Sequence, residues 1–318
     1  MSPDTAIEAR SLVRTFGDFE AVAGVDLSVR RGEIYGFLGP NGAGKSTTVR
    51  MLTTLLRPTA GSATVAGHDI AVEPEMVRLR IGVALQEAAL DPKQTGRELL
   101  DLQGRLYGLS RHARRTRLDE LLDLVSIGDA IDRRIGTYSG GMKRRLDLAA
   151  ALVHQPEVLF LDEPTTGLDP TSRAAVWAEV NSLKRDFGMT IFLTTQYLEE
   201  ADALADRVGI IAQGRIVAEG TPTELKRSIG SDVIIARVHR SDGPRVLDVV
   251  RALPDVERAE LGHDEVVMSV AHGAAAVTPV AVALTEAGIT VEGLTLRTPT
   301  LDDVFLHITG GRLQEDAA

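Results

Sequence analysis

The sequence predicts an α/β core followed by a smaller α+β domain, and three features support this fold class. Short apolar runs at 158–161 and 190–194 are typical of buried parallel strands that are joined by a helix. A glycine-rich loop connects an apolar run at 34–38 to a helix-like run at 46–56. Beyond about residue 230 the order changes to strand, helix, strand, strand, helix and strand, which indicates a second, ferredoxin-like domain.

The other elements of the first part follow from apolar spacing and from chain breakers. Residues 7–38 contain short apolar runs punctuated by glycine, among them 21–29, which predicts strands. The helix-like run at 46–56 is expected to stop at 57–61, because that segment contains a proline and a glycine. Residues 95–136 carry apolar side chains at helical spacing, which predicts a mainly helical region.

The second domain is divided into short elements of both kinds. We predict strand 233–238, helix 245–253, strands 256–261 and 266–270, helix 277–287 and strand 289–296. A last helix is expected after Thr300, since Thr300 and Asp303 have the spacing of a capping box.

Composition and charge exclude several kinds of function. The 318 residues carry a formal net charge of −10, and most of the acidic excess lies in residues 231–318, which disfavours binding to nucleic acid. The lack of cysteine excludes disulfides, iron–sulfur clusters and a cysteine nucleophile. The N-terminal residues are acidic where a secretion signal is basic, and no apolar run reaches the roughly 18 residues of a spanning helix. We therefore expect a cytoplasmic protein that needs a separate chain to span a membrane.

The loop before the helix-like run fits the pattern G-x-x-x-x-G-K-[ST], in which backbone N–H groups turn inward on phosphate. Lys45 is expected to hold the β- and γ-phosphates, Ser46 to ligate Mg²⁺ and Thr47 to hydrogen-bond a phosphate oxygen. A chance glycine-rich turn is the alternative, but the flanking strand and helix disfavour it. The predicted phosphate-binding residues are Gly39, Pro40, Asn41, Gly42, Ala43, Gly44, Lys45, Ser46 and Thr47.

Two adjacent carboxylates end the apolar run at 158–161. At the end of a buried strand, Asp162 is placed to face a Mg²⁺ ion, and Glu163 to polarise an attacking water molecule. The alternative is an acidic pair in a solvated turn.

A second anion site is predicted at residues 139–141, where Ser139, Gly140 and Gly141 precede a helix-like run. Together with the phosphate loop and the carboxylate pair, this segment resembles the signature, Walker A and Walker B elements of ATP-binding cassette (ABC) ATPases over about the first 225 residues. Tyr138 and Met142 stand where Leu and Gln are usual in that family.

The resemblance implies a P-loop NTPase cassette within residues 1–225. It would have a RecA-like core, an antiparallel β subdomain and a helical subdomain at about 87–138, followed by a C-terminal domain at 231–318. ATP and Mg²⁺ are the implied ligands. In this family the signature of one subunit closes on the γ-phosphate held by the other, which implies a head-to-tail homodimer with two sandwiched ATP molecules.

Three further residues match motifs of the family. Gln86 matches the Q-loop, which ligates Mg²⁺ and connects the nucleotide to the helical subdomain and the membrane partner. Asp169 matches the D-loop at the dimer interface. Phe16 matches the aromatic residue that stacks on adenine, although for an isolated Phe in a strand-like segment packing in the core is the alternative.

Gln196 stands after the strand at 190–194 where the family usually has a switch histidine. Glutamine can donate a hydrogen bond to the γ-phosphate but cannot transfer a proton, so Glu163 would carry more of the catalytic work.

Two clusters of basic residues, at 111–117 and 143–145, have two possible interpretations. They could face anionic lipid or a membrane subunit, or they could be solvated helix faces. We favour the second interpretation, because charge runs on helices are usually solvated.

The segments 196–202 and 300–306 resemble the daunorubicin/doxorubicin-resistance ATP-binding group of drug exporters. This resemblance implies two copies of the chain on the cytoplasmic side of the cell membrane, paired with two copies of a separate integral-membrane permease. It also implies efflux of a hydrophobic drug or antibiotic. The C-terminal domain would serve assembly and regulation, or would only stabilise the dimer.

Two other functions stay open at this point. A soluble ABC ATPase of ribosomes or DNA is expected to carry two cassettes, a long coiled-coil insertion or a basic tail, and the sequence has none of these. A regulatory nucleotide switch with little hydrolysis fits Gln196 but not an intact Glu163.

Overall fold

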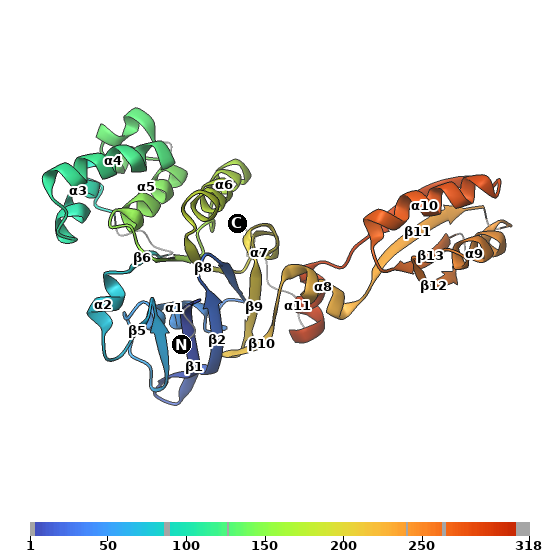
Figure 1. Ribbon diagram of the computed structural model, residues 1–318, viewed down its shortest axis with the longest axis horizontal. Coiled ribbons are helices and arrows are strands. Elements are labelled where there is room, and N and C mark those ends of the chain that lie inside the picture. Colours follow the sequence, from blue (N-terminus) through green and yellow to red (C-terminus); the bar gives the residue numbers. More distant parts are fainter. Residues whose placement is uncertain (1–3, 86–89, 126, 240, 263–264, 310–318) are drawn as a thin grey trace. The chain divides into compact units, whose positions relative to one another are not determined.

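A computed structural model describes residues 4–85, 90–125, 127–239, 241–262 and 265–309. The chain divides into two compact units, the first ending at Pro222 and the second beginning at Thr223 (Figure 1). The first unit contains two sheets, and the second contains one sheet with its own core. In the described residues, no helix is long and apolar enough to cross a membrane.

The first unit is built on a mostly parallel sheet with the strand order β10-β9-β3-β8-β7-β6. Neighbouring strands from β6 to β9 run parallel, and β10 pairs with β9 in the antiparallel sense. The carboxyl ends of the adjacent strands β3, β8 and β7 therefore meet at one edge of the sheet. The strands are β3 (Ile34–Leu38), β6 (Ile81–Ala84), β7 (Val158–Asp162), β8 (Thr190–Thr195), β9 (Arg207–Ala212) and β10 (Arg215–Gly220).

Both faces of the central strands are buried, which explains their continuous apolar runs. Phe37 and Phe192 point into a core shared with a second, antiparallel sheet, whereas Leu159 and Leu193 point into a core beneath the helices. The antiparallel sheet has the order β2-β1-β4-β5, and α1 lies between the two sheets because it contacts β2, β4 and β7. These elements are β1 (Thr5–Phe16), β2 (Phe19–Arg30), β4 (Ala60–Val65), β5 (His68–Asp69), α1 (Lys45–Leu52) and α2 (Pro74–Arg78).

Helix α1 is shorter than the predicted run of 46–56, because it ends at Leu52. The Thr53 hydroxyl donates to the carbonyl of Val49 at 2.8 Å, and Thr54 takes a left-handed conformation with φ of 63°. The left-handed backbone of Thr54 thus ends the helix before the proline at position 58 is reached.

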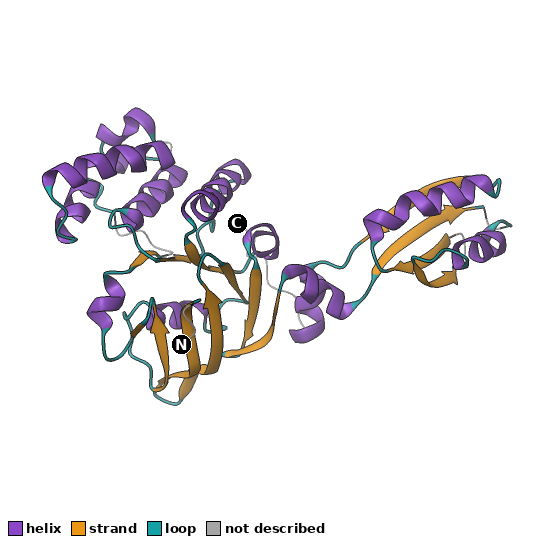
Figure 2. Ribbon diagram, viewed as in Figure 1, coloured by secondary structure: helices purple, strands orange, loops and turns teal. Residues whose placement is uncertain are grey.

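Three helices of the first unit pack together as one group (Figure 2). Helices α3, α4 and α5 pack against one another, so the group includes α5, which lies beyond the predicted helical region of about 87–138. Helix α5 also packs on β6 of the central sheet. Helices α6 and α7 follow β7 and β8 along the chain. The helical elements are α3 (Gly96–Leu106), α4 (Arg111–Val125), the 3-10 turns η1 (Gly128–Asp132) and η2 (Ile135–Thr137), α5 (Gly140–Leu152), α6 (Pro170–Phe187) and α7 (Leu198–Leu204).

The second unit has the predicted order of strands and helices. Its antiparallel sheet has the order β12-β13-β11-β14, which is the ferredoxin-like topology, and its core lies between that sheet and helices α9 and α10. Thr300 and Asp303 form the predicted capping box, with the Asp303 N–H donating to the Thr300 hydroxyl at 3.2 Å and the Thr300 N–H donating to Asp303 Oδ2 at 2.9 Å. The elements are α8 (Pro222–Ile229), β11 (Asp232–Val238), α9 (Gly243–Arg251), β12 (Val256–Leu261), β13 (Glu265–Val270), α10 (Gly273–Glu286), β14 (Val291–Arg297) and α11 (Leu301–Thr309).

Phe192 lies at the centre of the aromatic core that supports the strand ends. Its ring centroid is 5.6 Å from that of Tyr35, 5.4 Å from that of Phe37 and 5.5 Å from that of Phe160. We predict that Phe192→Ala lowers the free energy of unfolding of the first unit by about 3–5 kcal/mol, measured by urea denaturation. The control Phe187→Ala removes a ring that is 60% exposed and should change it by less than about 0.5 kcal/mol. Equal losses in the two variants would contradict this account of the core.

Candidate nucleotide site

The glycine-rich loop forms a tight turn between β3 and α1, at the edge where the central strands end. Gly44 has φ of 106°, and a Cβ atom at this position would lie 2.5 Å from the carbonyl oxygen of Ala21. A Cβ atom on Gly39 would lie 2.4 Å from the carbonyl oxygen of Ile211. No side chain caps the start of α1, so the first N–H groups of this helix face a position where an anion can accept their hydrogen bonds.

Lys45 is the first residue of α1, and its ammonium group is buried in the loop. Nζ donates to the carbonyls of Gly39 at 2.8 Å and Pro40 at 3.2 Å, and it lies 3.2 Å from Glu163 Oε1. Lys45 is 4% exposed, and burial lowers its pKa although Glu163 and Asp162 act to raise it. The structure thus brings the predicted phosphate ligand and the predicted water-polarising residue into direct contact.

Asp162 ends β7 within reach of the same loop. Its Oδ1 atom accepts a hydrogen bond from the Thr194 hydroxyl and lies 3.4 Å from the Ser46 hydroxyl, which donates to it. The Asp162 carboxylate and the Ser46 hydroxyl are two of the three groups that the sequence assigned to Mg²⁺, and they are adjacent. This pair fits Mg²⁺, which commonly binds one or two protein oxygens and completes its shell with phosphate and water.

Glu163 follows directly and is 7% exposed, so the alternative of an acidic pair in a solvated turn is wrong. Its backbone is left-handed, with φ of 48°, and its N–H donates to the carbonyl of Thr194 at 3.1 Å and to the hydroxyl of Thr194 at 3.0 Å. Sequence reasoning missed Thr194. The available signal was a hydroxyl residue at the end of a strand that the fold places next to β7.

Gln196 follows β8 and is half-buried. Because β8 lies between β3 and β7, Gln196 comes from the same edge of the sheet as the phosphate loop and Glu163. Gln86, the other predicted glutamine, lies outside the described residues.

The predicted signature segment lies at the start of α5. Ser139 is the N-cap residue, its hydroxyl accepts from the N–H of Met142 at 3.2 Å, and both Ser139 and Gly140 are exposed. Gly141 is buried, and a Cβ atom there would lie 3.2 Å from the hydroxyl of Ser172 in α6. The start of α5 therefore lies against the start of α6.

Asp169 is the N-cap residue of α6 and is exposed. Its carboxylate accepts from the Ser172 hydroxyl at 2.6 Å and from the N–H groups of Ser172 at 3.0 Å and Thr171 at 3.1 Å. These hydrogen bonds lower the pKa of Asp169. Since Ser172 contacts both Asp169 and Gly141, the predicted D-loop and the predicted signature share one surface.

Phe16 lies at the end of β1 and is 46% exposed, so the alternative of core packing is wrong. The guanidinium carbon of Arg14 lies 4.6 Å from the centroid of the Phe16 ring. An exposed ring of this kind is available to stack on a planar ligand.

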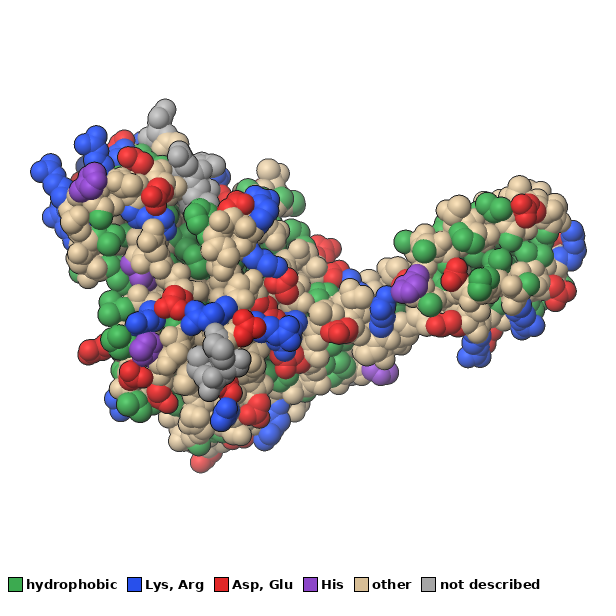
Figure 3. Space-filling view, viewed as in Figure 1, with side chains coloured by type: hydrophobic (Ala, Val, Ile, Leu, Met, Phe, Trp, Pro, Cys, Tyr) green, Lys and Arg blue, Asp and Glu red, His purple; other side chains and the backbone are tan. Residues whose placement is uncertain are grey.

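The basic residues of the helical group are only partly solvated. Figure 3 shows Lys and Arg side chains on the outside of this group, and Arg111 and Arg115 are exposed. Arg114, however, contacts Asp101 at 2.6 Å, and Arg117 donates to the carbonyl of Leu152 at 2.7 Å.

The cluster at 143–145 also differs from the solvated face that we favoured. Lys143 is exposed, but Arg145 lies 3.8 Å from Glu179, and the Arg144 side chain is only 11% exposed. Arg144 therefore points into the molecule.

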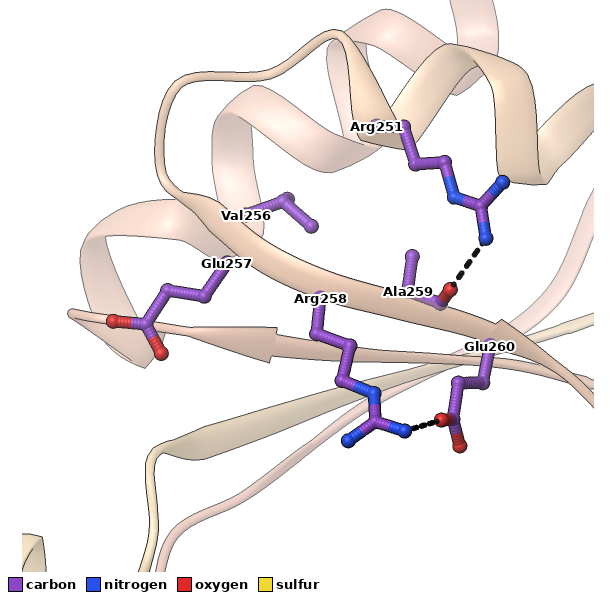
Figure 4. A pocket seen from close by; sticks show the side chains of 6 residues that line it. All are labelled: Arg251, Val256, Glu257, Arg258, Ala259 and Glu260. Atoms are coloured by element: carbon purple, nitrogen blue, oxygen red, sulfur yellow. Dashed lines mark hydrogen bonds and ion pairs between the residues drawn. The ribbon is translucent and has the colours of Figure 1, made fainter.

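The second unit contains a shallow hollow along β12 (Figure 4). Arg251 donates to the carbonyl of Ala259 at 3.2 Å, and Arg258 forms an ion pair with Glu260. Glu257, the remaining charged residue of the lining, accepts from the Ser231 hydroxyl at 2.6 Å. The charged side chains here are thus engaged by separate partners and do not converge on one point, so the residues that line the hollow form no catalytic arrangement.

The fold and the site together define an ATP-binding cassette. Residues 22–166 match the model of the ABC transporter family, and residues 220–309 match that of the C-terminal domain of DrrA1-3-like ATP-binding proteins. The chain is 51% identical to the daunorubicin resistance ATP-binding protein DrrA3 of Streptomyces coeruleorubidus, and the match covers 96% of each chain. It is 37% identical to the linearmycin resistance ATP-binding protein LnrL of Bacillus subtilis, with 97% of this chain and 100% of that protein covered.

A solved structure of the ATP-binding subunit of an ABC transporter has the same fold. Its TM-score is 0.64 at 30% identity, and the match covers 71% of this chain and 93% of that one. The chain belongs to the DrrA group of ABC transporter ATP-binding proteins, whose chemistry is ATP hydrolysis coupled to transport.

The loop geometry predicts that Gly44→Ala weakens ATP binding about tenfold or more, because the new Cβ atom clashes with the Ala21 carbonyl and displaces the start of α1. Titration with a fluorescent ATP analogue measures this. The control is Gly188→Ala, which also replaces a left-handed glycine, with φ of 61°, but at a position where the new Cβ atom would meet no atom within 4 Å beyond its own chain neighbours. This control should leave the affinity unchanged, and an equal loss in both variants would show that the clash is not the cause.

Proposed function

We propose that this chain powers the export of a hydrophobic drug or antibiotic through a separate membrane permease. The support is its similarity, over nearly its whole length, to relatives that are named for resistance to daunorubicin and linearmycin. A phosphate site recognises only the nucleotide, so the permease selects the transported compound.

The observation that carries the hydrolytic role is the contact of 3.2 Å between the buried groups Lys45 Nζ and Glu163 Oε1. On ATP binding, Lys45 exchanges this carboxylate and the loop carbonyls for the β- and γ-phosphates. Glu163 is then released beside the γ-phosphate, where it polarises the attacking water. Gln196 donates a hydrogen bond to the γ-phosphate but transfers no proton.

Asp162 and Ser46 would hold Mg²⁺, with Gln86 as a further proposed ligand. The buried carboxylate next to the Ser46 hydroxyl supports this assignment. When bound, the ion neutralises negative charge on the phosphates.

The active assembly that we propose is a head-to-tail homodimer. ABC ATPase subunits dimerise and pair with membrane permeases. Ser139, Gly140 and Asp169 are exposed at the starts of α5 and α6, where a second copy can reach them. Each copy holds one ATP through its phosphate loop, with Phe16 stacked on the adenine, and closes the ATP of the other copy with Ser139, Gly140 and Gly141.

We assign a separate role to each domain of the chain. Residues 1–225 form the ATP-binding domain, and residues 231–318 form a C-terminal domain for assembly or regulation. Two copies of the chain lie at the cytoplasmic side of the cell membrane, bound to two copies of the permease.

The first test replaces the residue that polarises water. Glu163→Gln should bind ATP with unchanged or higher affinity but hydrolyse it about 10²–10⁴ times more slowly, because the amide cannot accept the proton. Phosphate release and binding of a fluorescent ATP analogue measure the two effects. In cells that co-express this chain with a candidate permease and export daunorubicin, this variant should also stop the efflux.

The control for this test is Glu157→Gln, since Glu157 precedes β7, is ion-paired with Arg31 and Arg80 on the surface, and does not contact the site. It should keep full activity. Normal phosphate release by Glu163→Gln would overturn the hydrolytic role. If the unchanged chain hydrolyses ATP normally but cells with it export no more drug than cells with Glu163→Gln, the export function would be overturned.

The second test concerns the residue that replaces the switch histidine. Gln196→Ala should lower turnover about tenfold, because one hydrogen bond to a charged group contributes about 1.5 kcal/mol or more. Gln196→Glu keeps the size but loses the donor and adds a negative charge, so it should lower turnover further. Unchanged steady-state ATPase activity in Gln196→Ala would reject the contact with the γ-phosphate.

A further inference from the structure

Arg144 lies in α5, little more than one turn after the exposed signature residues, and its guanidinium group contacts three main-chain carbonyls. Nε donates to the carbonyl of Pro164 at 3.0 Å, and Nη2 donates to the carbonyl of Asp162 at 3.3 Å. Nη1 donates to the carbonyl of Leu85 at 2.7 Å and to Asp147 Oδ2 at 3.3 Å. One side chain of the helical group thus bonds to the ends of two strands of the central sheet.

Two of these carbonyls belong to the residues on either side of Glu163. The left-handed backbone of Glu163 is unfavourable for a residue with a side chain, so the surrounding structure has to hold it. Thr194 holds the Glu163 N–H, and Arg144 holds the flanking carbonyls of Asp162 and Pro164. Together these contacts fix the direction in which the Glu163 carboxylate leaves the chain.

The charge of Arg144 is balanced inside the protein. Asp147 lies one turn further along α5 and is its ion-pair partner, and burial raises the pKa of Asp147 to about 6 while Arg144 opposes the rise. A guanidinium group suits this position because its fork of N–H donors can reach several carbonyls at once, which an ammonium group on a flexible stem does less well.

We propose that Arg144 is a positioning residue for ATP hydrolysis, which holds the backbone of Glu163 and couples it to the signature helix of the same subunit. The proposal rests on the role of Glu163 proposed above. Because Ser139 and Gly140 begin the helix that carries Arg144, a movement of α5 toward the ATP of the partner also shifts the carbonyls that orient Glu163 toward its own ATP.

The test measures ATPase kinetics of the full chain. Arg144→Gln should lower kcat about 10–100-fold, since a displacement of about 1 Å at a catalytic group can cost that much. The KM for ATP and the affinity for a fluorescent ATP analogue should change less than about twofold, because Arg144 has no role in holding the phosphates. Arg144→Lys should lose less, because it keeps the charge and some of the hydrogen bonds.

A matched control is Arg117→Gln. Arg117 also donates to a carbonyl of α5, that of Leu152 at 2.7 Å, but at the end of the helix away from the site, and it should leave kcat unchanged. Thermal unfolding of all variants shows whether they fold. If Arg144→Gln does not fold, kcat and KM of Arg144→Lys are compared with those of the wild type instead.

A double-mutant cycle distinguishes positioning from general support. If Arg144 acts through Glu163, adding Arg144→Gln to Glu163→Gln should not lower the residual rate further. Multiplicative losses in the double variant, or a raised KM with unchanged kcat, would overturn the proposal. Full activity of Arg144→Gln together with an inactive Glu163→Gln would overturn this proposal alone, whereas full activity of Glu163→Gln would overturn the proposed function and this proposal with it.

Discussion

The site depends on three parallel strands that end at one edge of a buried sheet. The order β3, β8, β7 places the phosphate loop, Gln196 and the Asp162–Glu163 pair after adjacent strands, although they are far apart in the sequence. The ammonium group of Lys45 and two carboxylates are therefore buried together. Burying such charges costs about as much as their attraction returns, so the apolar core on both faces of the sheet, not the ion pair, holds them in place. In the mechanism proposed above, ATP therefore displaces the Glu163 carboxylate from Lys45 while the sheet that carries both residues stays in place.

Much of this arrangement could be predicted from the sequence, because it depends on local patterns. Continuous apolar runs identified the central strands, and the spacing of Gly39, Gly44 and Lys45 identified the loop between strand and helix. The second domain could be predicted in the same way, since alternating short elements leave few possible topologies. These patterns predict local structure, because each of them involves residues that are close together in the chain.

The predictions that failed concerned contacts between distant segments. Thr194 looks like an ordinary strand residue until the sheet order places it beside β7, where it bonds to Asp162 and Glu163. Arg144 lies in a basic run that reads as a solvated face, but α5 packs on β6 and turns this side chain inward. The end of α1, in contrast, was mispredicted for a local reason: Thr54 takes a left-handed conformation with φ of 63°, which no glycine at that position announces in the sequence.

Tyr138 and Met142, which stand where Leu and Gln are usual in the signature, both pack against the core of the helical group. Tyr138 is 6% exposed, and its hydroxyl donates to the carbonyl of Ala130 at 2.6 Å, so the larger side chain packs within the helical group with its polar atom satisfied. Met142 packs against the same core. Both changes leave the exposed face with Ser139 and Gly140 as it is. The start of α5 thus leaves Ser139 and Gly140 exposed, while Tyr138 and Arg144 contact the rest of their own unit, with Arg144 bonded to the carbonyls beside Glu163.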